Sequence, residues 1–148
     1  MADNYWRENY IDATTKEKEE ILQYEIDMLR QTCRKLNNSD SENQFQINLL
    51  VEALAVHIRV LVDFFYGKRT HLNDLIAQDF VLERINWENI RPVETETLKD
   101  AKNKADKQLA HLSTWRIKLQ RDGKKGWDVC KILKDIEIVI KEFNNNKI

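Results

Sequence analysis

Apolar residues recur along this chain at the spacing of amphipathic helices. The longest apolar run covers residues 47–66, INLLVEALAVHIRVLVDFFY, and contains neither glycine nor proline. At 100° per residue, the polar members of this run fall within one narrow stripe made of Asn48, Glu52, Arg59 and Asp63. Ionisable residues are costly at the centre of a bilayer, so the run is not expected to span a membrane. The pattern predicts a helix over about 42–66 at the centre of a helical bundle.

Three further stretches have the period of a helix with one buried face. The first helix is predicted to begin at Thr14, because Thr14 and Glu17 have the spacing of a capping box. Its predicted buried seam consists of Leu22, Ile26, Leu29, Cys33 and Leu36. A third long helix is predicted over about 98–121, capped by Thr95 or Thr97, and a fourth over about 128–143.

The connections between these helices are expected to be short or irregular. Asp40 or Ser41 can cap the central helix, and Gly67 is placed to end it in a left-handed conformation. Residues 72–87 have enough apolar positions for one or two short helices, and 88–96 contain the only proline and predict an irregular crossover. The fold class is therefore predicted as all-α, an up-and-down four-helix bundle with short additional helices.

Length and composition are consistent with one domain over residues 1–148. The chain has 33% charged residues, 3 glycines and 1 proline, which favours long helices. Residues 1–13 are expected to form an N-terminal arm held by the aromatic rings of Tyr5, Trp6 and Tyr10, and residues 144–148 a frayed tail. The first ten residues lack an export signal, so we expect a cytoplasmic protein. Cys33 and Cys130 are expected to be buried, reduced thiols, and no metal or other cofactor is predicted.

The net charge of −1 is unevenly distributed along the sequence. Residues 1–98 hold 11 Lys or Arg against 18 Asp or Glu, whereas residues 99–125 hold 9 against 3. The basic charge is therefore concentrated on the third predicted helix and the loop after it. Such a concentration can bind an anion such as nucleic acid, or can form a solvated face without a ligand.

One flank of the third predicted helix carries Lys104, His111, Trp115 and Lys118 at helical spacing. Arg116 falls near the centre of the apolar face of the same helix, where an unpaired guanidinium would be costly. Two interpretations are open for Arg116. It either braces the bundle by pairing with Glu52 or Asp63 of the central helix, or it binds a phosphate beside His111.

The stretches VHIRVLVDFFYGKR and ADKQLAHLSTWR resemble small bacterial helical proteins related to HEPN domains. The resemblance implies a four- or five-helix bundle that forms a homodimer and cleaves RNA without a metal. In active HEPN domains an Arg precedes a His on one helix with four to six residues between them. By resemblance, His111 matches that His and Lys104 stands in the position of the Arg. Lys104 departs from the pattern, because Lys cannot hold a phosphate with two parallel hydrogen bonds as Arg does.

The predicted function is RNA or nucleotide binding, with metal-independent endoribonuclease activity in phage defence or a toxin–antitoxin system. His111 would be the general acid or base, because an unperturbed imidazole titrates near neutral pH, and Lys104 and Arg116 would stabilise the phosphate. Lys107, Lys118 and Trp115 are the predicted nucleic-acid contacts. The alternatives are that His111 is an ordinary surface residue and that the protein is a catalytically inactive module binding an antitoxin or other protein. His57 is interpreted as a core histidine hydrogen-bonded to a neighbour.

Overall fold

The chain folds into an all-helical bundle, as the sequence predicts. The computed structural model describes residues 10–110, 112–122 and 126–148, and these form six α-helices and two short 3-10 segments. The β-type pairing found in this part of the chain is one isolated bridge, between Val81 and Lys147. Among the helices so described, none is both long and apolar enough to cross a membrane.

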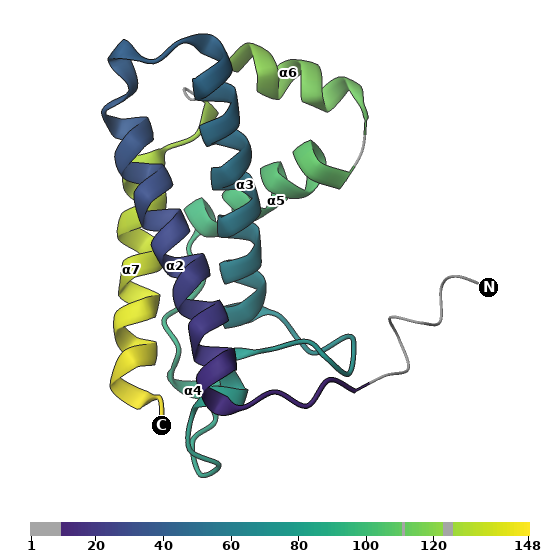
Figure 1. Cartoon of the computed structure of the whole chain (residues 1–148), viewed down its shortest axis with the longest axis vertical. Helices are drawn as coiled ribbons and strands as arrows, with labels where there is room; N and C mark the ends of the chain where they lie inside the picture. Colours follow the sequence, from purple (N-terminus) through teal and green to yellow (C-terminus); the bar gives the residue numbers. More distant parts are fainter. Residues whose placement is uncertain (1–9, 111, 123–125) are drawn as a thin grey trace, which may run out of the picture.

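Three long helices run side by side along the longest axis of the molecule (Figure 1). They are α2 (Thr15–Asn37), α3 (Gln44–Tyr66) and α7 (Val129–Asn146). Helix α3 packs against α2 on one side and against α5 (Glu96–Ala110) on the other, while α7 contacts both α2 and α5. The apolar run over residues 47–66 therefore forms the central helix, as predicted.

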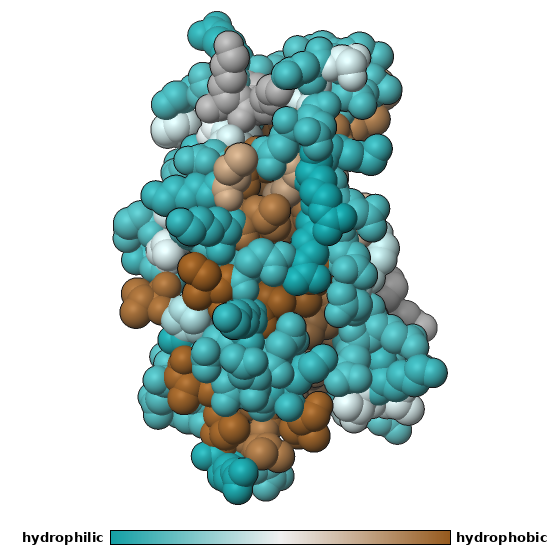
Figure 2. All heavy atoms as spheres, turned by 90° about the vertical axis from the view of Figure 1, so that its left-hand side faces the viewer, coloured by the Kyte–Doolittle hydropathy of each residue, from teal (hydrophilic) through white to brown (hydrophobic). Residues whose placement is uncertain are grey.

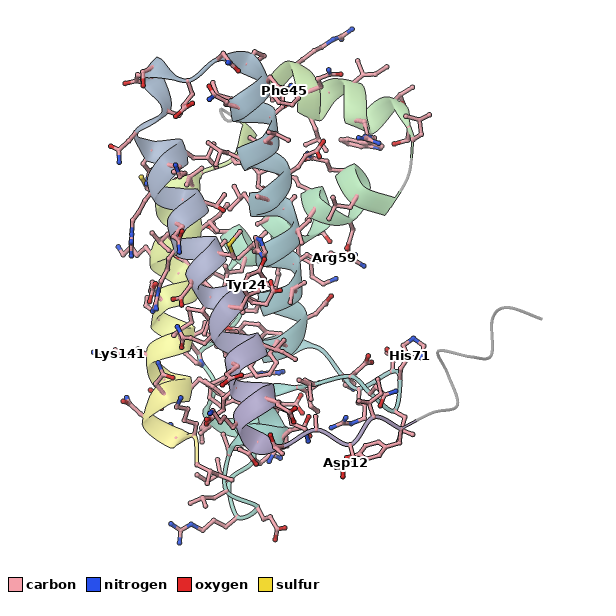
Figure 3. The ribbon with its side chains drawn as sticks, viewed as in Figure 1. Asp12, Tyr24, Phe45, Arg59, His71 and Lys141 are labelled. Atoms are coloured by element: carbon pink, nitrogen blue, oxygen red, sulfur yellow. The ribbon has the colours of Figure 1, made fainter. Side chains whose placement is uncertain are left out.

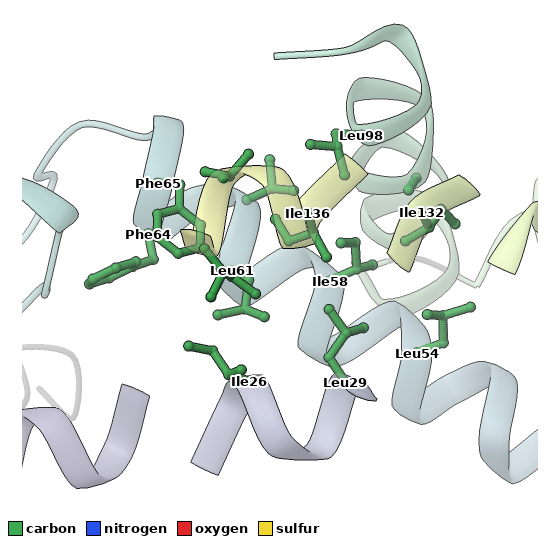
Figure 4. Packing of buried hydrophobic residues seen from close by; sticks show 14 of the residues in the cluster. Ile26, Leu29, Leu54, Ile58, Leu61, Phe64, Phe65, Leu98, Ile132 and Ile136 are labelled. Atoms are coloured by element: carbon green, nitrogen blue, oxygen red, sulfur yellow. The ribbon is translucent and has the colours of Figure 1, made fainter. Parts of the chain in front are cut away.

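The core gathers around the middle of α3 (Figure 4). Leu54, Ile58 and Leu61 of this helix are fully buried, and Leu29 of α2 and Leu98 of α5 meet them with no exposed surface of their own. Burial of one such side chain contributes about 1.5–3 kcal/mol. The seam predicted for α2 is buried at Ile26, Leu29, Cys33 and Leu36, with Leu22 partly buried.

The outer face of α2 and α7 bears an apolar strip between polar side chains (Figure 2). One ion pair joins the two helices there: Arg30 of α2 donates to both carboxylate oxygens of Glu137 of α7, at 2.6 and 2.9 Å. Two parallel charge-assisted hydrogen bonds fix the relative position of the helices as well as attracting them. The pair therefore helps to set the register of α7 on α2.

Aromatic rings pack together where α3 and α7 reach their C-terminal ends. Phe64 and Phe65 of α3 meet Phe143 of α7 edge-on, with ring centroids 5.6 and 5.4 Å away. The 3-10 segment Ala77–Phe80 and the short helix α4 (Trp87–Ile90) add Phe80 and Trp87 to this cluster. Helix α7 continues to Asn146, and the N–H of Ile148 donates to Phe80 O at 2.9 Å. The sequence had predicted a frayed tail here, but the backbone of its last residues is hydrogen-bonded.

Two helix ends differ from the predicted ones. The cap of α3 is Asn43, which forms a capping box with Gln46, while Asp40 and Ser41 belong to a 3-10 turn, Ser39–Ser41. Gly67 ends α3 with φ of −73°, so it is not left-handed as predicted. Its N–H donates to Asp63 O at 2.8 Å, and a Cβ at this position would collide with that oxygen. Close approach to a carbonyl therefore favours glycine here, and not a positive φ.

Other predicted helix starts are confirmed. Thr14 and Glu17 form the capping box at the start of α2. The Thr95 hydroxyl accepts a hydrogen bond from the N–H of Leu98 at 3.3 Å and so caps α5. The predicted contacts of Tyr5 and Trp6 lie outside the described residues, and Tyr10 is exposed.

Cys33 and Cys130 differ in environment. Cys33 is buried as predicted, and burial raises its pKa to about 12. Cys130 is exposed, which contradicts the prediction. Its neighbour Val129 takes the inward position of the first turn of α7, so the Cys130 side chain lies on the outer surface, with Sγ 3.4 Å from Asn37 Oδ1.

The third long helix predicted over 98–121 is two helices. Helix α5 ends at Ala110, and α6 (Thr114–Asp122) folds back over it to form a helical hairpin beside the upper half of α3 (Figure 1). Helix α5 runs away from α3, so a continuation in the same direction would have no core to cover. Leu112 in the turn is 93% exposed, whereas the fold-back buries Leu119. The helical spacing of apolar residues therefore extends to about residue 121, although α5 itself ends at Ala110.

Candidate nucleic-acid interface

An exposed tryptophan lies between two lysines on the α5–α6 hairpin. Trp115, in the first turn of α6, is 49% exposed. The ammonium of Lys107, in the last turn of α5, lies 4.0 Å from the centroid of its indole ring, and that of Lys118 lies 5.4 Å from the centroid. We call Lys107, Trp115 and Lys118 the Trp115 platform. These are the three residues predicted to contact nucleic acid, and the fold brings them together.

The hairpin, and not a continuous helix, produces this arrangement. Lys118 is three residues after Trp115, so the two side chains lie on one face of α6. Lys107 precedes Trp115 by eight residues and reaches the ring only because the chain reverses between α5 and α6. The platform thus depends on a turn between α5 and α6 that the sequence pattern does not predict.

Ion pairs separate the lysines of the basic segment into two groups. Lys99 lies 2.9 Å from Glu96, and Lys102 lies 3.4 Å from Asp63 and 3.1 Å from Asp106. Within residues 10–110, 112–122 and 126–148, no carboxylate lies at ion-pair distance from Lys107 or Lys118. Lys107 and Lys118 are therefore available to an anionic ligand at the Trp115 platform.

Lys104 does not lie at the platform. Its ammonium donates to Gly126 O at 2.6 Å, lies 2.8 Å from Asp100 Oδ2 and is 5.9 Å from the centroid of the Trp127 ring. These partners hold the side chain at the start of the segment leading into α7. The single line predicted for Lys104, Trp115 and Lys118 does not exist, because these residues belong to two helices with different directions.

The polar stripe of α3 pairs with α5, and not with Arg116. Arg59 lies 2.6 Å from Asp106, and its side chain leaves α3 toward α5 in Figure 3. Asp63 forms an ion pair with Lys102 of α5. In the part of the chain that the structure describes, Arg116 forms no ion pair with Glu52 or Asp63, so the predicted brace is wrong. The turn before α6 displaces Arg116 from the position it would have on a continuous helix.

Arg116 instead lines a cavity of about 670 Å³ between α3 and α6. Its side chain is half-buried there, with Asn48 and Glu52 of α3 on the opposite wall. Of the three predicted catalytic residues, Lys104 and Arg116 are therefore directed to different places. His111, the predicted acid or base, lies outside the described residues.

His57 is a core residue with a partner, as predicted. It is 7% exposed, and its Nδ1 lies 2.6 Å from Oε2 of Glu25 on α2. The ring of Tyr24 meets the imidazole edge-on at 6.2 Å between centroids. Sequence reasoning placed His57 in the core but could not name Glu25, because the pairing depends on the register between α2 and α3.

The described residues contain no group of three or more His, Cys, Asp and Glu side chains placed to hold a metal ion. Comparison of the chain with family models, with curated proteins and with solved structures finds no match. The likeness to HEPN proteins therefore remains a prediction from the sequence.

Proposed function

We propose that this protein binds single-stranded RNA at the Trp115 platform. The observation that carries the proposal is the position of the exposed Trp115 ring beside the ammonium groups of Lys107 and Lys118, 4.0 and 5.4 Å from its centroid. Proteins that bind single strands without strong sequence preference combine an aromatic surface for the bases with cations for the backbone. The platform supplies both within one hairpin.

Base stacking and phosphate binding can both contribute to RNA affinity at the Trp115 platform. Stacking of one base on an aromatic side chain contributes about 1–3 kcal/mol by alanine substitution. Lysine ammonium groups sit on flexible four-carbon stems and can move from the ring to a phosphate when a base arrives. Because Lys107 and Lys118 have no carboxylate partner among the described residues, such a move breaks no ion pair there.

Cleavage of the bound strand is the second part of the proposal and depends on His111. In metal-independent cleavage the 2′-oxygen attacks the adjacent phosphorus and the 5′-oxygen leaves. His111 would take the proton from the 2′-hydroxyl or supply one to the leaving oxygen. Lys104 is held by Asp100 and Gly126, so Arg116 is the better candidate for stabilising the phosphate.

A protein-binding function is the competing proposal, and one observation favours it. Helix α3 exposes Phe45 and Leu49 near its start, 70% and 52% exposed, and Val56 and Val60 further along. These positions recur on one face of the helix, which is typical of a surface covered by another protein. The partner would be an antitoxin, another protein or a second copy of this chain. In that case the Trp115 platform would bind no RNA.

Labelled single-stranded RNA mixed with the purified chain in EDTA separates these functions. Binding that weakens with salt, together with cutting that is lost in His111→Ala, supports the endoribonuclease. Binding without cutting supports an RNA-binding protein that is not an enzyme. Failure to bind RNA at low salt contradicts the proposal and leaves the protein-binding function.

A further inference from the structure

The cavity between α3 and α6 contains several polar groups that have no partner among the described residues. Its α3 wall carries Asn48, Val51 and Glu52, and its α6 wall carries Arg116, Ile117 and Leu119, with Gln108 of α5 between them. The volume of about 670 Å³ is in the range of small-molecule sites, which is roughly 300–1,000 Å³. Apolar walls with a few converging polar groups are the usual composition of such sites.

Two charged groups and one amide oxygen of the cavity have no partner among the described residues. Glu52 and Arg116 face the same space from opposite walls, yet neither forms an ion pair with another described residue. The side-chain oxygen of Gln108 is shielded from solvent and has no hydrogen-bond partner among those residues. Polar groups shielded from water are normally hydrogen-bonded, and an unmet one costs about 1–3 kcal/mol. This cost applies to the Gln108 oxygen, whereas the Glu52 carboxylate is exposed to solvent. A ligand with hydrogen-bond donors for these two acceptors and negative charge for Arg116 would suit the cavity.

Among the bases of RNA, guanine fits the Glu52 carboxylate best. Its N1–H and N2–H₂ groups are neighbouring donors that can meet both oxygens of the Glu52 carboxylate. Adenine and cytosine place an acceptor beside their amino group, and uracil places a carbonyl on each side of its single N–H. A carboxylate therefore gains two hydrogen bonds from guanine, but faces an acceptor with each of the other bases. Val51 and Leu119 supply apolar contacts for the faces of the ring.

The cavity and the Trp115 platform lie on neighbouring surfaces of α6. Trp115 and Arg116 are consecutive, so their side chains leave the helix about 100° apart. An RNA strand that stacks one base on Trp115 can place the next base in the cavity between α3 and α6. Arg116 stands between these two positions and can bind the intervening phosphate. Proteins read single-stranded RNA by this combination of stacking on an aromatic side chain and hydrogen bonding to the Watson–Crick edge of a splayed base.

We infer that the cavity between α3 and α6 is a guanine-binding pocket that gives the RNA-binding platform a sequence preference. This inference rests on the proposed RNA binding at Trp115. Glu52 is the residue that determines specificity, and Arg116 positions the phosphate between the stacked base and the guanine. Neither residue is needed to build the core, because Glu52 is exposed and Arg116 is half-buried.

The experiment compares short labelled RNAs on the full chain by fluorescence anisotropy. The probes are UUGUU, UUAUU and UUUUU, which are too poor in guanine to form multi-stranded structures. We expect UUGUU to bind roughly tenfold more tightly than the other two, the effect of one good bidentate pair. Glu52→Gln should reduce that ratio to below about twofold, because the glutamine side chain has one acceptor oxygen in place of two. The affinity for UUUUU should stay nearly the same.

Matched controls make the outcomes distinct. Glu20→Gln removes the same charge from the exposed surface of α2 and should keep the preference for UUGUU. Equal binding of the three probes by the unaltered chain would overturn the guanine pocket and leave RNA binding intact. A preference that survives in Glu52→Gln would overturn it as well. Failure of all three probes to bind at low salt would overturn both the pocket and the proposed function.

Discussion

The ammonium of Lys107 lies 4.0 Å from the centroid of the Trp115 ring, across the turn that reverses the chain between α5 and α6. This contact couples the end of one helix to the start of the next and places a cation beside an aromatic surface that is half exposed. A cation over an indole face contributes about 0.5–1 kcal/mol at an exposed site. A phosphate and a base can compete for both members of such a weak contact.

Trp115→Ala is expected to weaken binding of single-stranded RNA by about 1–3 kcal/mol, the contribution of one stacked base. Trp115→Phe should lose less, because it retains an aromatic face. Titration with labelled RNA at constant salt measures both variants. Tyr24→Ala is the matched control, since Tyr24 is an aromatic residue on α2 with 57% exposure. An equal loss in Tyr24→Ala would indicate that the affinity does not depend on the platform.

Lys107→Ala and Lys118→Ala should each flatten the salt dependence of RNA binding. Each lost phosphate contact changes the slope of log K against log salt by about 0.7 for a single strand. Lys104→Ala should leave the slope unchanged, because Asp100 and Gly126 already hold that ammonium. Lys141→Ala is the surface control, since Lys141 projects from α7 on the far side of the molecule (Figure 3). Slopes that change equally in all four variants would indicate diffuse attraction with no defined site.

Arg116→Ala should change the free energy of unfolding by no more than about 0.5 kcal/mol, as for an ordinary surface position. Arg116 is half-buried and has no ion pair among the described residues, so no buried carboxylate loses its partner. Arg30→Ala provides the comparison, because it removes both hydrogen bonds to Glu137 and should cost roughly 1 kcal/mol. Urea unfolding of the two variants checks this. A larger loss for Arg116→Ala would restore the bracing role.

His57→Ala should destabilise the fold by about 2–3 kcal/mol, because it leaves Glu25 without its hydrogen-bond partner and opens a cavity in the core. Urea unfolding at constant pH measures the loss. His71→Ala is the control, since His71 is an exposed loop residue (Figure 3). If both histidine variants unfold at the same urea concentration as the unaltered chain, the Glu25–His57 pair contributes nothing to stability.

The two cysteines should react with thiol reagents at very different rates. Burial raises the pKa of Cys33 to about 12, so almost no thiolate forms at pH 8, and the sulfur is also shielded. Cys130 is exposed and should be modified first. We expect one thiol to react in the native protein and the second only after unfolding in urea. Two fast-reacting thiols in the folded chain would show that the core around Cys33 opens readily.

The sequence predicted those parts of the fold that local chemistry determines. The capping box at Thr14, the cap at Thr95 and the apolar run of α3 each depend on residues a few positions apart. The break between α5 and α6 could not be predicted in this way, because no glycine or proline marks it. Helix α5 ends where it does because it runs away from α3, and a longer α5 would have no core to cover. Ser113 and Thr114 were the only local signal, since such residues favour helix starts.

The site predictions that failed are those that assumed one continuous helix over residues 98–121. Arg116 was given an ion-pair partner on α3 by extending a continuous helix, but after the turn it faces Glu52 across a cavity without an ion pair between them. Trp115 and Lys118 were grouped by helical spacing and Lys107 was added as a further basic contact, and the structure brings the three together through the same turn. Composition therefore identified the available charges and the aromatic ring. Lys99 and Lys104 pair with carboxylates three and four positions earlier on the same helix, a spacing that the sequence already contains. The contact of Lys102 with Asp63 of α3 depends on the fold.

The most direct test of RNA binding at Trp115 is the nuclear magnetic resonance spectrum of the indole N–H groups. The chain has 4 tryptophans, and Trp115→Phe assigns the signal of Trp115. Single-stranded RNA added at low salt should shift that signal strongly. The signal of Trp87 should stay in place, because its indole N–H is buried and donates to Phe65 O at 2.8 Å. An unchanged Trp115 signal at saturating RNA would contradict the assignment of this platform as the binding site.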